Sequence, residues 1–292
     1  MGLHRKTFVA GLAATALTLS ACGSGSGGGP KVADKPSFEA GTTMAKIAAA
    51  GKMKVGTKFD QPGFGLKGLD GQLSGFDVEV AKIIAGAMGV KPESIEWVES
   101  PSKVREERIE KGEVDLVAAT YTINDKRKER ITFAGPYYVA GQQLMVKSDN
   151  AKIKGPQDLK ANASQQVCSV TGSTPAEKIK TYLASEAQLV LFDVYSKCAN
   201  ALRTGQVQVV TTDNVILLGF VSKSDKAFKL VGEQFTKEPY GIGIKKGDVK
   251  FCEFINKTLK DNETAYNKAW ADTAGKVEGA SAAKLPAAAA CS

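Results

Sequence analysis

Residues 111–117 read Lys111-Gly112-Glu113-Val114-Asp115-Leu116-Val117 and lead on to Thr120. A second stretch, Thr204-Gly205-Gln206-Val207-Gln208-Val209-Val210, has the same pattern and leads on to Thr211-Thr212-Asp213. Each joins the end of a helical pattern, a glycine, an apolar strand and polar residues at the carboxyl end of that strand. Because α/β sheets bind ligands at this end, the repeated pattern predicts two similar lobes that face one crevice. Chance similarity of two helix–strand units is the alternative.

Short β-branched runs alternate with helical patterns along the rest of the chain. Strands are predicted over 53–57, 95–98, 114–120, 142–147, 166–170, 188–192, 206–212 and 241–245. A helix is predicted between Gly75 and Gly89, with Ser74 as its cap, and one long amphipathic helix over 251–270. This alternation predicts an α/β fold with largely parallel sheets.

The amino-terminal segment has the order of a secretory signal. Arg5 and Lys6 precede an apolar stretch over 8–19, which is shorter than the roughly 20 residues that span a bilayer. Leu19-Ser20-Ala21-Cys22 resembles a bacterial lipobox, in which lipid is attached at Cys22. We expect a signal peptide over 1–21, a flexible linker over 22–37, and a protein anchored on the extracytoplasmic face of the cell membrane. An ordinary signal peptide with an incidental cysteine is the alternative.

The composition excludes several classes of function. Hydrophobic residues make up 43% and charged residues 24% of the chain, which is typical of a globular protein. The single histidine is His4, inside the predicted signal, so catalytic histidines and His-containing metal sites are excluded from the mature chain. We expect no metal and no cofactor. The net charge is +8, or +6 without Arg5 and Lys6, and the basic residues are scattered, which argues against nucleic-acid binding.

Four cysteines remain after Cys22, and an even number in an exported protein predicts two disulfides. Three pairings are possible. Proximity in the sequence favours Cys168–Cys198 and Cys252–Cys291. Free thiols are the alternative.

Three segments together have the chemistry of an α-amino-acid site. Thr120-Tyr121-Thr122-Ile123-Asn124-Asp125-Lys126-Arg127 ends a predicted strand with hydroxyls and an arginine, which can clamp a carboxylate. Gly172-Ser173-Thr174-Pro175 has the pattern of a helix start, where hydroxyls and free amides favour an anion. Asp213, after the echoed strand, can accept an ammonium group.

From about Lys52 to Asp272 the chain resembles family 3 extracellular solute-binding proteins, the polar amino-acid receptors of ABC importers. The segments that carry the resemblance are Val55-Gly56-Thr57, Leu73-Ser74-Gly75-Phe76-Asp77-Val78, the Thr120–Arg127 stretch, Phe133-Ala134-Gly135-Pro136-Tyr137-Tyr138, Gly172-Ser173-Thr174 and Thr212-Asp213. The resemblance implies two α/β lobes, a central ligand cleft and two crossover strands, near 141–147 and 236–242. Lobe 1 would comprise 38–141 plus 240–292, and lobe 2 would comprise 142–239.

The resemblance also implies a role for each site residue. The α-carboxylate would be held by Arg127, Thr122, Ser173 and Thr174. The α-ammonium would be held by Asp213 and Thr120. The ligand's side chain would meet Lys58, Ser102, Arg105 and Gln61, and the pocket wall would include Phe64 and Tyr121.

The predicted ligand is L-glutamate. Two cations, Lys58 and Arg105, aimed at one small volume favour an anionic side chain, and residues 57–63 resemble glutamate-binding lipoproteins. Aspartate and glutamine are the alternatives. We expect a monomeric receptor, not an enzyme, that delivers its ligand to an ABC permease with its cytoplasmic ATPase. The competing prediction is an exported lyase or wall-cleaving enzyme on the same scaffold, with Asp60 or Glu99 as its acid.

Overall fold

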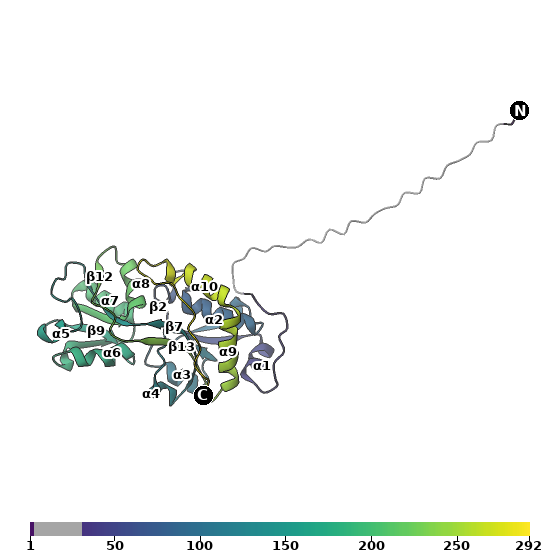
Figure 1. Cartoon of the computed structure of the whole chain (residues 1–292), viewed down its shortest axis with the longest axis horizontal. Coiled ribbons are helices and arrows are strands. Elements are labelled where there is room, and N and C mark those ends of the chain that lie inside the picture. The colour runs from purple at the N-terminus through teal and green to yellow at the C-terminus, as the bar shows by residue number, and fades with distance from the viewer. Residues whose placement is uncertain (3–30) are drawn as a thin grey trace.

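The structure is a computed structural model that describes residues 1–2 and 31–292. The predicted signal peptide beyond residue 2, the first part of the linker and Cys22 lie outside the described residues. Figure 1 shows two α/β lobes side by side, connected by strands that run between them. Among the described residues, no helix is both long enough and apolar enough to cross a membrane.

Each lobe contains a five-stranded sheet, and the two sheets have the same plan. The order in the first sheet is β5 (Ile95–Glu99), β1 (Met53–Thr57), β6 (Leu116–Val117), β13 (Glu238–Ile244) and β7 (Thr132–Ala140). The order in the second sheet is β10 (Leu189–Phe192), β9 (Val167–Val170), β11 (Val209–Asp213), β8 (Gln142–Lys147) and β12 (Phe228–Val231). In both sheets the first three strands pair in parallel, and the fourth strand is antiparallel to both of its neighbours, so four of the five strands run in the same direction.

The repeated pattern seen in the sequence therefore corresponds to equivalent strands, since β6 and β11 are each third in their sheet. The expectation of largely parallel sheets is confirmed, since only the fourth strand of each sheet runs in the opposite direction. Strand β6 is shorter than the predicted 114–120. Thr120 has φ +45°, a left-handed backbone conformation that turns the chain out of the sheet.

The chain passes between the sheets twice. It leaves β7, turns at Gly141 and enters β8, and it returns between β12 and β13. We propose the division into lobe 1 (38–141 and 240–292) and lobe 2 (142–239), which gives each sheet its own lobe apart from the first residues of β13. A small sheet of β2 (Asp60–Gln61), β3 (Gly65–Lys67) and β4 (Leu73–Ser74) extends lobe 1.

Two helix predictions need correction. Helix α2 (Phe76–Ala87) has Gly75 as its N-cap and no side-chain cap, because Ser74 belongs to β4. The long carboxyl-terminal helix is two helices, α9 (Val249–Asp261) and α10 (Glu263–Asp272), which meet at Asn262. The amide side chain of Asn262 donates to the carbonyl of Thr258 there, a local bond that competes with regular helix.

The remaining helices are short and flank the sheets. The α-helices are α1 (Thr43–Ala50), α3 (Arg105–Glu110), α4 (Asp125–Lys128), α5 (Asp158–Ala161), α6 (Thr174–Ile179), α7 (Tyr195–Thr204) and α8 (Asn214–Ser222). The 3-10 helices are η1 (Pro92–Ser94), η2 (Lys180–Tyr182), η3 (Glu186–Gln188) and η4 (Ala274–Lys276).

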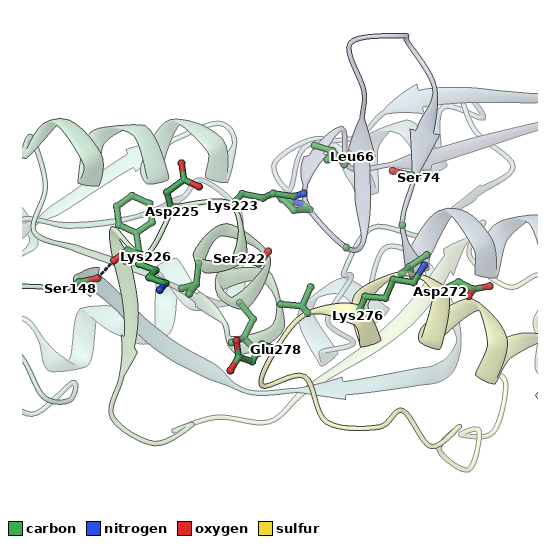
Figure 2. A pocket seen from close by; sticks show the side chains of 18 residues that line it. Leu66, Ser74, Ser148, Ser222, Lys223, Asp225, Lys226, Asp272, Lys276 and Glu278 are labelled. Atoms are coloured by element: carbon green, nitrogen blue, oxygen red, sulfur yellow. Dashed lines mark hydrogen bonds between the residues drawn. The ribbon is translucent and has the colours of Figure 1, made fainter.

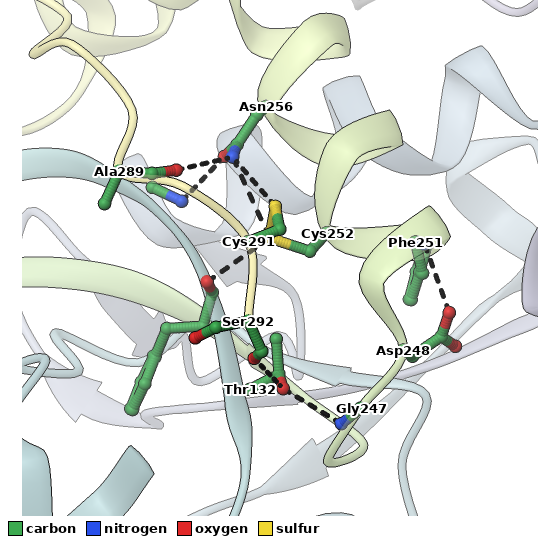
Figure 3. The surroundings of a disulfide bond; sticks show 11 residues. Thr132, Gly247, Asp248, Phe251, Cys252, Asn256, Ala289, Cys291 and Ser292 are labelled. Atoms are coloured by element: carbon green, nitrogen blue, oxygen red, sulfur yellow. Dashed lines mark hydrogen bonds between the residues drawn. A yellow bond between two sulfur atoms is a disulfide. The ribbon is translucent and has the colours of Figure 1, made fainter.

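Both favoured disulfides form, Cys168–Cys198 in lobe 2 and Cys252–Cys291 in lobe 1. The second one holds the carboxyl-terminal tail against α9 (Figure 3). The tail also bonds to β7, since the Ala289 N–H donates to the carbonyl of Gly135 at 2.7 Å. The segment after Gly275 is therefore packed on lobe 1.

Candidate functional site

The polar residues singled out in the sequence gather where the two lobes meet. They come from the carboxyl ends of β1, β6 and β11, from β2, and from the helices α3, α4 and α6 with the loops that precede them. A groove of about 660 Å³ opens onto this region and is lined from both lobes, including Ser102, Arg127, Gly172, Ser173 and Glu238. The lobes are in contact here, because the Thr174 hydroxyl lies 3.3 Å from that of Thr122.

Two buried cations occupy the lobe 1 side of the site. Lys58, directly after β1, is 2% exposed, and its ammonium donates to the Ser102 hydroxyl at 2.9 Å. Arg105, on α3, is also 2% exposed and donates to the carbonyl of Ala119 at 2.8 Å, while its Nε has no partner. Among the described residues neither cation forms an ion pair. Burial, and then the charge of Arg105, lowers the pKa of Lys58 to about 7.

The aromatic ring of Tyr121 lies against the guanidinium groups of two arginines. The Arg105 guanidinium carbon lies 3.9 Å from the centre of this ring, and that of Arg127 lies 5.1 Å from it. The ring itself is fully buried and packs edge-on against Phe133. Tyr121 therefore fixes both guanidinium groups, which is a larger role than the predicted pocket wall.

Arg127 is held on three sides. It donates to the carbonyl of Thr122 at 2.6 Å and, across the cleft, to the carbonyl of Gly172 at 3.0 Å. Its Nε lies 3.2 Å from a carboxylate oxygen of Glu106. A guanidinium has five N–H donors, so two remain for a ligand carboxylate. Burial and the nearby Arg105 charge lower the pKa of Arg127 to about 10, which leaves it charged at neutral pH.

Asp213, at the end of β11, presents one free oxygen. Its Oδ2 accepts a hydrogen bond from Tyr240 at 2.6 Å, while Oδ1 is buried without a partner. Burial, and then the charge of Glu238, raises the pKa of Asp213 to about 7. An ammonium group beside Oδ1 would satisfy this oxygen and stabilise the carboxylate.

Thr120 is held in its left-handed conformation from several directions. Its N–H donates to Asp77 at 2.8 Å, and its hydroxyl lies 3.0 Å from Oε1 of Gln61. The amide nitrogen of Gln61 is buried and has no partner, so it is a free donor at the site. A β-branched residue with φ +45° is strained, and strain of this kind concentrates at functional sites.

The helix start in lobe 2 contributes Ser173 and Thr174. The Ser173 hydroxyl caps α6 by accepting from the N–H of Ala176 at 3.1 Å, and it lies 3.4 Å from the Ser169 hydroxyl, which itself donates to the carbonyl of Thr211. The Thr174 hydroxyl donates instead to Glu238 at 2.7 Å. The Ser173 proton is engaged only in the long contact to Ser169, so of the two hydroxyls it is the one that can more easily turn to a ligand carboxylate.

Comparison with known proteins identifies the family. The sequence model of bacterial extracellular solute-binding proteins, family 3, matches residues 53–269. The chain belongs to this family. The glutamate-binding protein GluB of Corynebacterium glutamicum is 42% identical over 261 residues, which cover 85% of this chain and 83% of that protein. The glutamine-binding protein of Geobacillus stearothermophilus is 38% identical and covers 75% of this chain and 82% of its own length.

Solved structures agree with the two-lobe fold of a family 3 protein. An ancestral arginine-binding protein bound to glutamine superimposes with a TM-score of 0.71 at 35% identity. The match covers 77% of this chain and 99% of that one.

One residue inferred from the family pattern lies elsewhere. Phe64 is fully buried in the aromatic core of lobe 1, among Phe76, Tyr138, Tyr240 and Trp270. We therefore treat it as a core residue and not as part of the pocket wall. The packing of an aromatic cluster depends on contacts between distant segments, which the local pattern around Phe64 does not indicate.

Sequence reasoning missed four residues that surround the predicted ones. They are Asp77, Glu106, Glu238 and Tyr240. Glu106 directly follows Arg105 at the start of α3, and these two adjacent charges are a local signal that could have indicated it. Asp77 lies in the first turn of α2, and its pKa is raised to about 6 by burial. Glu238 and Tyr240 lie on the crossover strand β13, and no local signal marks them.

The proposed enzyme acids are not part of this cluster. Glu99 is exposed, and Asp60 accepts a hydrogen bond from the N–H of Ser196 at 3.0 Å. Within residues 1–2 and 31–292, no group of three His, Cys, Asp or Glu side chains could hold a metal ion.

Proposed function

We propose that this protein is an extracytoplasmic receptor for L-glutamate that closes around its ligand and delivers it to an ABC permease. The observation that carries the proposal is the pair of buried cations, Lys58 and Arg105, neither of which has a carboxylate partner among the described residues. Burying an unpaired charge is costly, and a ligand carboxylate between the two would offset that cost. The names of relatives support the same class, since a glutamate-binding and a glutamine-binding protein are both similar to this chain.

The ligand's backbone groups would be recognised at the other end of the site. The α-carboxylate would take the two free donors of Arg127, with Thr122 and Ser173 beside it, and the α-ammonium would meet Oδ1 of Asp213 and Thr120. Because Arg127 belongs to lobe 1 and Asp213 to lobe 2, such a ligand contacts both lobes and favours the closed form.

The side chain of the ligand decides between glutamate, aspartate and glutamine. A γ-carboxylate would accept hydrogen bonds from Lys58, Ser102 and Gln61, all of which are donors. A glutamine carboxamide has only one acceptor atom. Its other polar group, the NH₂, is itself a donor and would face these donors. We therefore expect glutamate to bind more tightly than glutamine.

Membrane attachment through lipid on Cys22 and a monomeric state complete the proposal. The role is transport and not catalysis. The relatives named above are binding proteins, and the carboxylates of the site are engaged in holding Arg127, Thr120, Thr174 and Tyr240.

Calorimetric titration of ligand-stripped protein with glutamate, glutamine and aspartate tests this function. We expect one-to-one binding with micromolar or tighter affinity, about −8 kcal/mol or better, and a preference for glutamate. If none of the three binds, the proposed ligand class is wrong. Recovery of chemically altered ligand after long incubation would favour the enzyme instead.

A further inference from the structure

Two glycines of lobe 2 lie directly against the main chain of lobe 1. Gly219 is in the middle of α8 and faces Pro62, and Gly172 precedes α6 and faces Lys103. The first contact borders a groove of about 880 Å³ between the lobes, shown in Figure 2. The second borders the groove of about 660 Å³ that opens onto the candidate site. The lobes thus meet at two separate places through residues without side chains.

The Gly219 contact leaves no room for a methyl group. A Cβ on Gly219 would lie 2.4 Å from the carbonyl oxygen of Pro62 and 3.2 Å from its carbonyl carbon. Both are main-chain atoms, so they cannot rotate away as a flexible side chain would. The backbone of Gly219 is helical, and a helix interior normally favours alanine over glycine by about 1 kcal/mol. Helical propensity therefore gives no reason for glycine here, whereas the contact with the other lobe does.

The Gly172 contact is also too close for a methyl group, and a hydrogen bond lies beside it. A Cβ on Gly172 would lie 2.8 Å from Cα of Lys103 and 3.1 Å from its nitrogen. The carbonyl of Gly172 accepts from Arg127 across the cleft. Gly172 has φ +79°, so local geometry also favours glycine, and a test must separate this effect from the contact.

We propose that Gly172 and Gly219 are positioning residues for ligand capture: their missing side chains let the two lobes approach far enough for one ligand to be held by both. This inference rests on the proposed function, because it concerns the closure that the ligand stabilises. In an open form the contact surfaces would separate, and a methyl group at either position would then meet only solvent. A substitution should therefore disfavour the closed form and leave the open form intact.

Gly219→Ala gives the sharper test, because stability and affinity should change in opposite directions. The melting temperature of the ligand-free protein should stay the same or rise, since alanine favours the helix. The affinity for glutamate should weaken by roughly 5- to 150-fold, the range expected for one methyl group forced into a packed contact. Ser222→Ala in the same helix adds no atom and is the control; its affinity should remain within twofold.

Gly172→Ala has a matched control in the same lobe. Gly205 has φ +83°, and its Cβ would have only the Lys147 ammonium nearby, at 3.7 Å. Gly205→Ala therefore introduces the same backbone strain without a contact between lobes. Both variants should lose similar stability, but only Gly172→Ala should lose affinity.

Closure itself can be measured by small-angle X-ray scattering, with glutamate alone and with a mixture of the common amino acids. We expect the wild type to contract with ligand, and Gly219→Ala and Gly172→Ala to contract less. If the wild type contracts with the mixture but not with glutamate, the glutamate proposal is refuted. The glycine variants can then still be compared with the wild type in the mixture. Wild-type affinity and full contraction in both glycine variants would overturn the inference, as would a wild type that contracts under neither condition.

Discussion

Replacing Lys58 with methionine should separate the stability of the empty protein from its affinity for glutamate. The Lys58 ammonium is fully buried and has Ser102 as its hydrogen-bond partner. Its pKa is lowered from 10.5 to about 7, mainly by burial. At about 1.4 kcal/mol for each pKa unit, the charged lysine costs the empty folded protein roughly 4–5 kcal/mol at or below pH 7.

The pH dependence follows from the direction of this shift. Between about pH 7 and 10.5 the folded, ligand-free protein binds fewer protons at Lys58 than the unfolded chain does. The stability contributed by this group therefore rises with pH across that window. Lys58→Met removes the cost, so the variant should melt several degrees above the ligand-free wild type at pH 7. The difference should shrink as the pH approaches 10.5.

Binding should respond in the opposite direction. Removing one partner of a buried charge pair typically costs about 2–5 kcal/mol, so glutamate should bind roughly 30- to 5,000-fold more weakly to Lys58→Met. Glutamine should lose less than about tenfold, because it has no distal charge to leave unpaired. Calorimetry with both ligands measures the change, and scanning calorimetry without ligand measures the stability.

Lys54→Met is the matched control, since Lys54 lies on β1, the strand that Lys58 directly follows, but is exposed. It should change neither quantity appreciably. If Lys58→Met kept wild-type affinity and wild-type selectivity for glutamate over glutamine, Lys58 would not contact the ligand's side chain, and the argument from unpaired cations would fail.

Three further perturbations test other parts of the account. Asp213→Asn should weaken glutamate binding by about 2–5 kcal/mol in calorimetry, because the α-ammonium loses its carboxylate; unchanged affinity would remove Asp213 from the site. Since the pKa of Asp213 is raised to about 7 in the empty protein, affinity should fall as the pH drops below 7, with protons released on binding at pH 6; a flat profile would contradict this role. Cys291→Ser should lower the free energy of unfolding by about 2–5 kcal/mol in denaturant titrations, with glutamate affinity unchanged, because the Cys252–Cys291 bridge lies on lobe 1 and outside the residues assigned to the ligand.

The sequence predicted those elements whose pattern is local. Strand β1 has the predicted bounds, as does β8, since both are compact β-branched or apolar runs. The division at Asn262 was missed because the apolar spacing continues through it. Strand β7 was also missed, since Pro136 lies within it and normally argues against a strand.

The sequence allowed prediction of the charged residues of the candidate site but not of their partners. Lys58 and Asp213 directly follow predicted strands, and Arg105 and Arg127 lie seven residues beyond two others. The structure brings all four to the region where the lobes meet. Their partners were not predictable in the same way. The Glu106 carboxylate meets Arg127 only because α3 packs beside α4, and such a contact between elements leaves no periodic pattern in the sequence.

The central claim is that Lys58 and Arg105 together bind the side-chain carboxylate of the ligand. A crystal structure of the protein with bound L-glutamate tests it most directly. The account predicts the γ-carboxylate within hydrogen-bonding distance of the Lys58 ammonium and close to the Arg105 guanidinium, with the α-ammonium at Oδ1 of Asp213. A γ-carboxylate that points away from both cations, with Lys58 still bonded only to Ser102, would contradict it.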